Sequence, residues 1–574
     1  MNARGTLKVV LVGRGPLTLR ASDYLATGGE GSVYRAKGTV VKLYTDQAKM
    51  RREGTDQKLA LLSRLSHPYI VAPSGLVTNE HGEPRGYYMP HVNGEALSRV
   101  FTTSYWQREG FSLTDANGLV AHMRAVVEYA HGKQALLVDA NELNWLVVRG
   151  KEYEPRVIDV DSWAIGKWPA SVIMPSIQDH HTKGFNEGTD WFAWGVVSFQ
   201  VYTGIHPYKG TLPGYGRGDL ARRMRENASV FRSDVRLNKA VRDVGTIPGP
   251  LLDWYRAVFE AGERIAPPSP HQTGVPQAPL LRTKRVVTTA QGALIYTRLR
   301  ARGGDPVVAV YPSGYAHLRS GALVSLASGK ELLPQVSPDA AVVVREGALM
   351  VGEPQHDRVL VRCVGVDEQV KECTVPLAAS MVVSGNGRLF GITARGLQEL
   401  AIRRVGARYV GAVGAEWPLL PQATNWFAGV GVMDGLGAMY LVVPFGERGI
   451  AIARVQELDR YRVLAATAAG RIAVVLALSQ AGEYVRMEFV FDASMQQHSV
   501  RTEVVQSAEL NAVVLEKGVV ARIDTDGELV ISVPTTGVVN MVHDKDIATD
   551  MQLARWGDRV IYLKDGAVWS LAMK

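Results

Sequence analysis

The chain has 574 residues, 46% of them hydrophobic and 21% charged, which is ordinary for a globular protein but too long for a single hydrophobic core. The net charge of +8 is modest and the short basic pieces are scattered, which favours a solvated surface over a nucleic-acid-binding face. The chain has two cysteines, no long apolar run and no N-terminal cleavage signal. We therefore expect a cytoplasmic protein without disulfides or membrane spans.

A glycine-rich turn between two apolar strands is the first element with chemical content. It reads Ala26-Thr27-Gly28-Gly29-Glu30-Gly31-Ser32-Val33, and Lys42 follows on the next strand. Glycines let backbone N–H groups approach phosphate oxygens because no Cβ stands in the way. The turn alone would also fit an ordinary tight hairpin, but a lysine within the following strand can reach the same phosphates. The two features together predict a phosphate-binding hairpin.

Polar residues follow a helix that apolar periodicity predicts over residues 115–130. Asp139 and Asn144 are five residues apart, and a strand, a turn and a second strand then lead to Asp159. Asp161 lies two residues further on and is an alternative to Asp159. A carboxylate can take a proton from a hydroxyl, and carboxylate or amide oxygens can hold Mg²⁺ beside phosphates. The order predicts a phosphoryl-transfer centre.

These segments resemble the protein-kinase family, whose loop reads G-x-G-x-x-G-x-V and whose catalytic loop has D-x-x-x-x-N. Gly28 and Gly31 match the second and third glycines, and Ala26 stands at the first. The resemblance covers roughly residues 20–268. It implies a bilobal α+β fold over residues 1–268, with an N-lobe of about 1–92 and a C-lobe of about 93–268.

The resemblance also assigns roles around the transferred phosphate. Asp139 would orient the acceptor hydroxyl and take its proton, while Asn144 and Asp159 would hold Mg²⁺, with Asp161 as the alternative ligand. Two further helices are expected over residues 190–202 and 251–261. Asp190, at the start of the first, would brace the catalytic loop through backbone N–H groups.

For the nucleotide, the resemblance assigns Lys42 to the α- and β-phosphates of ATP. Its carboxylate partner would come from the next helix, with Glu53 as the first choice and Asp56 as the second. Gly54 weakens a helix at this point.

The adenine would lie on Val33 and against the strand-to-hinge passage that ends in Met89-Pro90-His91-Val92. Met89 would be the gatekeeper. The carbonyl of Pro90 would accept a hydrogen bond from the adenine amine, and the N–H of Val92 would donate one to the ring.

Several positions depart from the family pattern. The arginine before the catalytic aspartate is Val138, and the lysine two residues after it is Asn141. Met174-Pro175-Ser176 stands where A-P-E belongs, so the glutamate that pairs with Arg264 is missing and Arg264 needs another partner.

The composition and the hydrophobic pattern of the chain change near residue 270. A proline-dense segment predicts a linker over residues 269–287, and short β-rich runs separated by glycine turns fill residues 288–574. A glycine followed by an apolar strand recurs at a mean spacing of about 44 residues, close to that of a four-stranded propeller blade. We expect an all-β domain, a β-propeller of about seven blades, with a pair of β-sandwiches as the alternative.

Three functions are compatible with these patterns. The leading hypothesis is a Ser/Thr kinase that uses ATP and Mg²⁺ and acts on a protein substrate, with the β-domain binding a protein or ligand partner. A pseudokinase or scaffold is the second, because family residues are missing around the catalytic loop. A kinase of a small metabolite is the third, and the well-formed helix over 190–202 argues against it. No membrane or nucleic-acid partner is expected.

Overall fold

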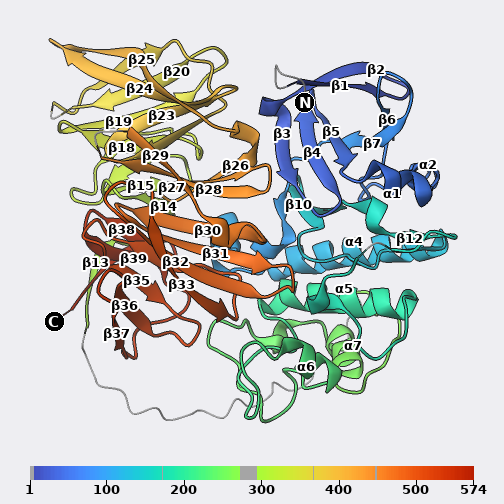
Figure 1. Ribbon diagram of the computed structural model, residues 1–574. Coiled ribbons are helices and arrows are strands. Elements are labelled where there is room, and N and C mark those ends of the chain that lie inside the picture. The colour runs from blue at the N-terminus through green and yellow to red at the C-terminus, as the bar shows by residue number, and fades with distance from the viewer. Residues whose placement is uncertain (1–5, 171, 272–293, 366, 447–448, 574) are drawn as a thin grey trace.

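The computed structural model describes residues 6–170, 172–271, 294–365, 367–446 and 449–573, which form two halves lying side by side (Figure 1). We call residues 6–271 the N-terminal region and residues 294–573 the all-β region. Among the described residues, every α-helix lies in the N-terminal region. Of the linker expected over 269–287, residues 272–287 lie outside the described ranges.

A seven-stranded antiparallel sheet opens the N-terminal region, in the order β2-β1-β6-β7-β5-β4-β3. Its strands are β1 (Thr6–Leu11), β2 (Gly15–Arg20), β3 (Tyr24–Thr27), β4 (Gly31–Ala36), β5 (Thr39–Tyr44), β6 (Gly75–Thr78) and β7 (Pro84–Pro90). The hairpin β1–β2 widens the sheet beside β6. The glycine-rich turn joins β3 to β4 and lies at the opposite edge.

Two short helices, α1 (Gln47–Arg52) and α2 (Thr55–Leu62), follow β5. The carboxylate of Asp46 caps α1 by accepting the N–H of Lys49 at 2.8 Å. Gly54 has a φ of +63°, a left-handed conformation that favours glycine. Gly54 therefore separates α1 from α2, and α2 is a new helix whose buried side chains are Lys58, Leu59 and Leu62.

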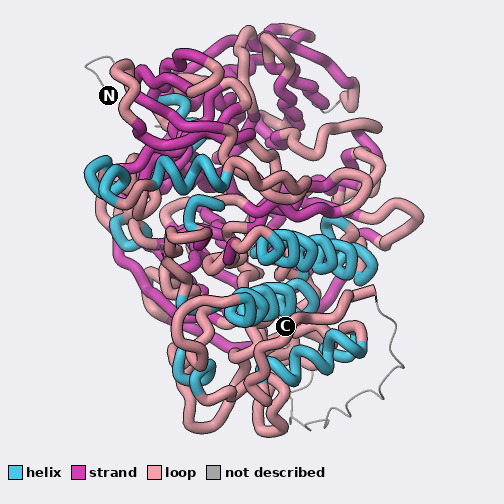
Figure 2. The backbone as a smooth tube through the Cα atoms, turned by 90° about the vertical axis from the view of Figure 1, so that its right-hand side faces the viewer, coloured by secondary structure: helices cyan, strands magenta, loops and turns pink. Residues whose placement is uncertain are grey.

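The lower half of the N-terminal region is helical, and Figure 2 shows its helices stacked beneath the sheet. Ser112 and Asp115 form a capping box at the start of α4 (Leu113–Gly132). The helix α5 (Glu187–Thr203) is buried along almost its whole length. These two helices confirm those expected over 115–130 and 190–202. The others are α3 (Thr103–Glu109), α6 (Leu220–Arg225) and α7 (Gly249–Phe259), the last of which corresponds to the helix expected over 251–261.

Short strands hold the loops between the sheet and the helices. They are β8 (Glu95–Ala96), β9 (Ala135–Leu136), β10 (Trp145–Arg149), β11 (Tyr153–Val157) and β12 (Ala164–Ile165). In the hairpin β10–β11, Trp145 pairs with Val157. The loop before β10 and the loop after β11 therefore lie at the same end of the hairpin, which brings the segments that carry Asn144 and Asp159 together.

The all-β region consists of seven four-stranded antiparallel sheets. Six of them use consecutive strands: β14 (Val307–Tyr311), β15 (Tyr315–Leu318), β16 (Leu323–Ser325) and β17 (Glu331–Leu333); β18 (Ala341–Arg345), β19 (Ala348–Pro354), β20 (Val359–Val364) and β21 (Val370–Val375); β22 (Met381–Gly385), β23 (Arg388–Thr393), β24 (Gly396–Val405) and β25 (Arg408–Pro418); β26 (Thr424–Phe427), β27 (Val430–Gly435), β28 (Ala438–Phe445) and β29 (Gly449–Arg454); β30 (Tyr461–Ala469), β31 (Ile472–Ser479), β32 (Tyr484–Phe491) and β33 (His498–Val505); β34 (Ala512–Val514), β35 (Val520–Ile523), β36 (Leu529–Val533) and β37 (Val538–Val542).

The seventh sheet joins the two ends of the all-β region. It contains β13 (Leu294–Arg300) together with β38 (Gln552–Trp556), β39 (Arg559–Lys564) and β40 (Ala567–Met573). In the pairing of β13 with β40, Leu294 lies opposite Met573. The first and last described strands of this region are thus neighbours.

The two regions share a hydrophobic core. Five side chains of the all-β region belong to the same buried cluster as the apolar faces of α4 and α5: Leu464, Leu476, Leu478, Tyr484 and Ala508. An interface that continues a core in this way resists relative motion of its two sides.

Candidate functional site

The glycine-rich hairpin is shaped by close backbone packing. The N–H of Gly28 donates to the carbonyl of Gly31 at 2.9 Å and closes the turn. A Cβ at Gly31 would lie 2.3 Å from the carbonyl oxygen of Leu43, so the pairing of β4 with β5 requires glycine there. A Cβ at Gly28 would meet nothing within 4 Å, which leaves open space beside its backbone. Val33 pairs with Lys42 across the two strands.

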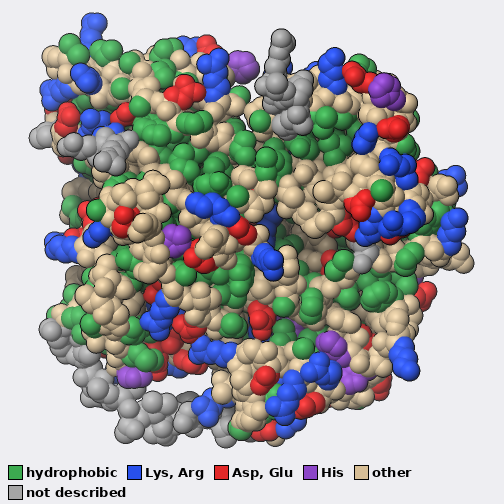
Figure 3. Space-filling model, viewed as in Figure 1, with side chains coloured by type: hydrophobic (Ala, Val, Ile, Leu, Met, Phe, Trp, Pro, Cys, Tyr) green, Lys and Arg blue, Asp and Glu red, His purple; other side chains and the backbone are tan. Residues whose placement is uncertain are grey.

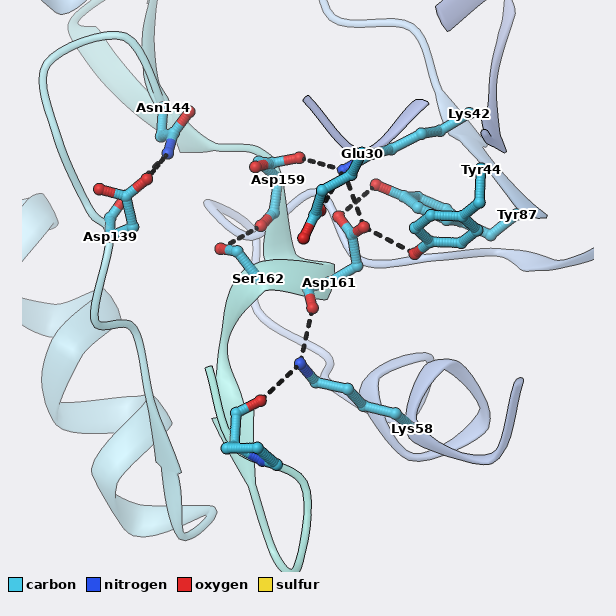
Figure 4. A network of polar contacts seen from close by, with 11 residues as sticks. Glu30, Lys42, Tyr44, Lys58, Tyr87, Asp139, Asn144, Asp159, Asp161 and Ser162 are labelled. Carbon is cyan, nitrogen blue, oxygen red and sulfur yellow. Dashed lines mark hydrogen bonds and ion pairs between the residues drawn. The ribbon is translucent and has the colours of Figure 1, made fainter. Parts of the chain in front are cut away.

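Lys42 is buried, and its Nζ lies among three carboxylates (Figure 4). It donates to Oδ1 of Asp159 at 2.7 Å and to Oδ2 of Asp161 at 2.8 Å, and Oε2 of Glu30 lies 3.5 Å away. Burial acts to lower the pKa of Lys42, but the charges of Asp161 and Asp159 outweigh it and hold the pKa well above its usual value. The amine is therefore a permanent cation at this point.

Asp161 and Asp159 have different surroundings. The side chain of Asp161 is 1% exposed, and its oxygens accept hydrogen bonds from Lys42 and from the hydroxyls of Tyr44 and Tyr87, both at 2.7 Å. Despite burial, these bonds hold the pKa of Asp161 below its usual range. Burial and the charge of Asp161 raise the pKa of Asp159 to about 6, and its side chain is 35% exposed. Asp159 is thus the more available of the two as a ligand.

The structure does not bring Glu53 to Lys42. Glu53 follows the last turn of α1, at the break made by Gly54, and its side chain is exposed on the rim of a cavity of about 630 Å³. The buried position on α2 is taken by Lys58, whose Nζ donates to the backbone carbonyl of Asp161 at 2.7 Å. The second choice, Asp56, is not among the ion-pair partners of Lys42 within the described residues. The carboxylate beside Lys42 that the sequence did not predict is Glu30.

Asp139 and Asn144 lie on one loop, linked by a hydrogen bond (Figure 4). Nδ2 of Asn144 donates to the backbone carbonyl of Asp139 at 2.7 Å, and the N–H of Met174 donates to Oδ1 of Asp139 at 2.8 Å. Burial raises the pKa of Asp139, although these bonds oppose the effect. The N–H of Ile158 donates to the carbonyl of Asn144 at 2.9 Å, which ties the loop to the segment that carries Asp159.

Asp190 holds the loop that leads to Asp139 through backbone N–H groups, as the sequence indicated. Its carboxylate accepts the N–H of Leu137 at 2.8 Å and the N–H of Val138 at 2.9 Å. Val138 has a φ of +59°, which is uncommon outside glycine, so these bonds stabilise a strained turn. Nε2 of His131 lies 3.0 Å from the same carboxylate. The loop is fixed from α5 and α4 together.

The expected adenine residues lie on the strand beside β5 and just after it. Met89 pairs with Val40 and Pro90 with Thr39 in the register of β7 and β5. Pro90 and Val92 also border a cavity of about 520 Å³ that reaches His67. Met89 and Pro90 therefore lie at the end of β7, on the strand beside the one that carries Lys42.

Arg264 finds a different partner from the one that the family pattern supplies. Its guanidinium forms two hydrogen bonds with Asp179, at 2.8 and 2.6 Å. Burial acts against the charge of Asp179, but Arg264 and neighbouring donors lower its pKa to about 2. Asp179 lies three residues beyond Ser176, so the missing glutamate is replaced by a carboxylate displaced along the chain.

The all-β region directly contacts the loop that carries Asp139 and Asn144. Glu142, within that loop, accepts the hydroxyl of Tyr484 at 3.3 Å, and Nζ of Lys209 lies 4.4 Å from the centre of the same ring. The turn before Tyr484 packs against the segment after Met174, since a Cβ at Gly482 would lie 2.0 Å from Oγ of Ser176. Burial raises the pKa of Glu142 and lowers that of Lys209 to about 8. Sequence patterns carried no signal for this contact.

Mg²⁺ is the metal that the family resemblance implies. Within the described ranges no group of three or more His, Cys, Asp or Glu side chains is placed to hold a metal ion. Mg²⁺ in phosphate sites is commonly held by one or two protein carboxylates and by the phosphates themselves. The partly exposed carboxylate of Asp159, next to the loop of Asn144, fits that requirement.

Two relatives with sequence similarity are cAMP-dependent protein kinases. The chain is 25% identical over 212 residues to the human cAMP-dependent protein kinase catalytic subunit PRKX, a match that covers 33% of this chain and 56% of the relative. It is 24% identical over 182 residues to cAMP-dependent protein kinase type 3 of Saccharomyces cerevisiae, covering 30% and 41%. The chain thus spans about half the length of the curated relatives it matches.

These matches support a protein-kinase domain in the chain and agree with phosphoryl transfer to Ser or Thr at the level of the family. No protein-family model matches the chain. In the part of the chain that the structure describes, no helix has the length and apolar character needed to cross a membrane.

Proposed function

We propose that the chain is a protein kinase that uses ATP and Mg²⁺ to phosphorylate Ser or Thr hydroxyls of a protein substrate. The observation that carries the proposal is the meeting of four groups at one end of the hairpin β10–β11. Lys42 bonds to Asp159, and the neighbouring loop joins Asn144 to Asp139. The similarity to cAMP-dependent protein kinases supports the same class of reaction.

Asp139 would act as the base for the acceptor hydroxyl. Burial raises the pKa of its carboxyl, which makes the carboxylate a stronger base than an exposed aspartate. The N–H of Met174 holds Oδ1, and the hydrogen bonds of Asp190 fix the loop on which Asp139 stands. The base is thus held in position before the acceptor arrives, which reduces the entropy lost at the reacting step.

Lys42 and the backbone of the glycine-rich turn would bind the phosphates, while Val33, Met89, Pro90 and Val92 would enclose the adenine. Asn144 and Asp159 would hold Mg²⁺, with Asp161 left to neutralise Lys42. When bound, the metal ion supplies positive charge beside the phosphates. Lys42 would exchange part of its bonding to Asp159 for bonding to phosphate oxygens.

We also propose that the seven sheets of the all-β region are the blades of a seven-bladed β-propeller. The pairing of β13 with β40 supports this arrangement, because it joins the ends of the region within one sheet. The proposed division is a kinase domain over 1–268, a linker over 269–287 and a propeller over 288–574. The propeller would dock or sense a partner through its loops, and the cytoplasm, where ATP and Mg²⁺ are available, is the proposed location.

The test is transfer of labelled γ-phosphate from ATP·Mg²⁺ to the protein itself and to a generic basic protein. We expect label with the wild type and none with Asp139→Asn. The matched control is Asp253→Asn, an exposed aspartate on α7, which should keep full activity. Equal labelling with Asp139→Asn would overturn the proposal.

A scaffold without catalysis is the second candidate, and one observation favours it. Active kinases use a carboxylate from the helix beside the sheet to position the lysine, whereas the buried side chain here is Lys58. Retained binding of ATP with no label on any tested protein, in the wild type as in Asp139→Asn, would favour the scaffold.

A further inference from the structure

A cavity of about 1220 Å³ lies between the two regions. Its wall on the N-terminal side includes Glu95, Arg99 and Leu146, and its wall on the all-β side includes Arg319 and Arg462. Small-molecule sites usually measure about 300–1,000 Å³, so this cavity has room for a ligand and water. Lys42, Asp139 and Asp159 are not among its lining residues. Figure 3 shows a recess between the two halves with Lys and Arg side chains beside it.

The cavity carries more positive than negative charge. Five arginines line it, against Glu95, Glu109 and Asp339: Arg99, Arg108, Arg149, Arg319 and Arg462. The three arginines of the N-terminal region all lie within ion-pair distance of Glu95 or Glu109. The two arginines of the all-β region are different. Within the described residues, the side chains of Arg319 and Arg462 form no ion pair and no hydrogen bond.

The position of Arg462 follows from its neighbours on both regions. Two residues along β30, the carbonyl of Leu464 accepts Nη1 of Arg99 at 2.9 Å. The charge of Asp434 acts on Arg462, and Asp434 itself contacts the glycine-rich hairpin through the hydroxyl of Tyr24 at 3.3 Å. Arg462 therefore lies where the all-β region faces both halves of the N-terminal region.

The surroundings of Arg462 disfavour its charge. Burial among the two regions lowers the pKa of the guanidinium, and Asp434 offsets only part of this effect. The side chain nevertheless remains in contact with the water of the cavity. The side chains of Arg319 and Arg462 are both exposed to that water, so an anion in the cavity can reach either guanidinium without displacing a protein partner.

We propose that this cavity binds a small phosphate-bearing molecule through Arg319 and Arg462. The planar fork of a guanidinium matches two oxygens of a phosphate, and two such groups without internal partners are free to bind it. The apolar side chains of Trp426, Phe427 and Leu143 line the same cavity and suit the uncharged part of the ligand. The inference does not depend on phosphoryl transfer, because none of the four proposed catalytic groups takes part.

The site would couple the two regions. A ligand in contact with Arg319 and Arg462 also lies against the wall that contains Leu146 and Ile158, next to the loop of Asn144 and the segment of Asp159. A ligand bound in the cavity would therefore affect the proposed nucleotide site through these direct contacts, without a change in the fold.

The probe is inorganic pyrophosphate, titrated calorimetrically into the full chain in the presence of EDTA. We expect saturable 1:1 binding, at least tenfold weaker affinity in Arg462→Gln and in Arg319→Gln, and unchanged affinity in Lys42→Met. Arg403→Gln is the matched control, because Arg403 is an exposed arginine of β24 outside the cavity. Arg462→Lys, which keeps the charge but not the fork, should lose less affinity than Arg462→Gln.

Three results would overturn the proposal. They are the absence of saturable binding, an equal loss in the Arg403→Gln control, and a loss confined to Lys42→Met, which would place pyrophosphate in the nucleotide cleft. Thermal melting of each variant verifies that it is folded. If Arg462→Gln does not fold, Arg462→Lys replaces it in the test.

Discussion

Two aspartates separated by one residue have opposite environments at the candidate site. Asp161 is enclosed by Lys42 and two tyrosine hydroxyls, and its pKa is lowered. Asp159 is partly exposed, and burial with the charge of its neighbour raises its pKa. An aspartate therefore has a structural role at position 161, whereas the aspartate at position 159 is accessible to a ligand.

Substitution should separate these two roles. Asp161→Asn leaves the buried cation Lys42 with one partner fewer, and we expect a loss of about 1–3 kcal/mol in the free energy of unfolding. Asp159→Asn removes a carboxyl group whose pKa is raised on folding from 3.8 to about 6. A raised pKa stabilises the folded state below pH 3.8, and this stabilisation is lost as the pH rises through about 6. At pH 7 this second substitution should not destabilise the fold but should abolish Mg²⁺-dependent nucleotide binding. Urea denaturation and calorimetric titration measure the two effects; the reverse pattern would contradict the assignment.

If Asp159 is the Mg²⁺ ligand, metal binding should depend on pH through its carboxyl group. As the proposed ligand, Asp159 would hold Mg²⁺ only when ionised, and its pKa of about 6 means that protonation would compete below that value. We expect the apparent affinity for Mg²⁺·ATP to be constant between pH 7 and 8. It should fall by roughly tenfold for each pH unit well below 6. Affinity that stays constant down to pH 5 would show that Asp159 is not the ligand.

At the scale of elements, the strand–loop–strand order explains why Lys42, Asn144 and Asp159 lie near one another. Lys42 lies within β5, and Asn144 and Asp159 flank a hairpin, so local spacing was enough to bring them together. The carboxylate partner of Lys42 was harder to predict from the sequence, because a helix break at Gly54 changes which side chains of α1 and α2 face the sheet. Glu53 was expected there, and Lys58 occupies the buried face.

Contacts between distant elements had no sequence signal at all. Tyr484 and Glu142 are 342 positions apart in the chain, and neither lies in a motif that specifies the other. Strand periodicity indicated that residues 288–574 are β-rich, and the pairing of their first and last strands follows only from the folded arrangement. Patterns of period two describe which face of a strand is buried, not which surface covers it.

The contact between β32 and the catalytic loop is testable. Tyr484→Phe removes the hydroxyl that donates to Oε1 of Glu142, and Oε2 has no hydrogen-bond partner among the described residues. We expect a loss of about 1–3 kcal/mol in the free energy of unfolding, together with slower phosphoryl transfer at unchanged ATP affinity. Tyr315→Phe, on β15, is the control, since no hydrogen bond of its hydroxyl is described. Equal effects of the two substitutions would mean that the contact with Glu142 is unimportant.

At the scale of the whole molecule, the shared core predicts cooperative unfolding. Leu476 and Leu478 on β31 are 1% exposed and belong to the cluster that contains α4 and α5. We expect one calorimetric transition for the full chain, and Leu476→Ala should lower the stability by about 2–5 kcal/mol and shift the whole transition. Two transitions, of which only one responds to Leu476→Ala, would show that the regions unfold independently.

The pairing of β13 with β40 has a consequence for biosynthesis. The two strands are separated by 279 positions between Leu294 and Met573, so at common ribosomal speeds β13 waits roughly 15–55 s for its neighbour. During that interval the N-terminal region has already left the ribosome while the last sheet of the all-β region is still incomplete. The nascent chain thus passes through a stage in which the edge of β13 is unpaired and open to chaperones, and that stage ends only when β40 has been translated.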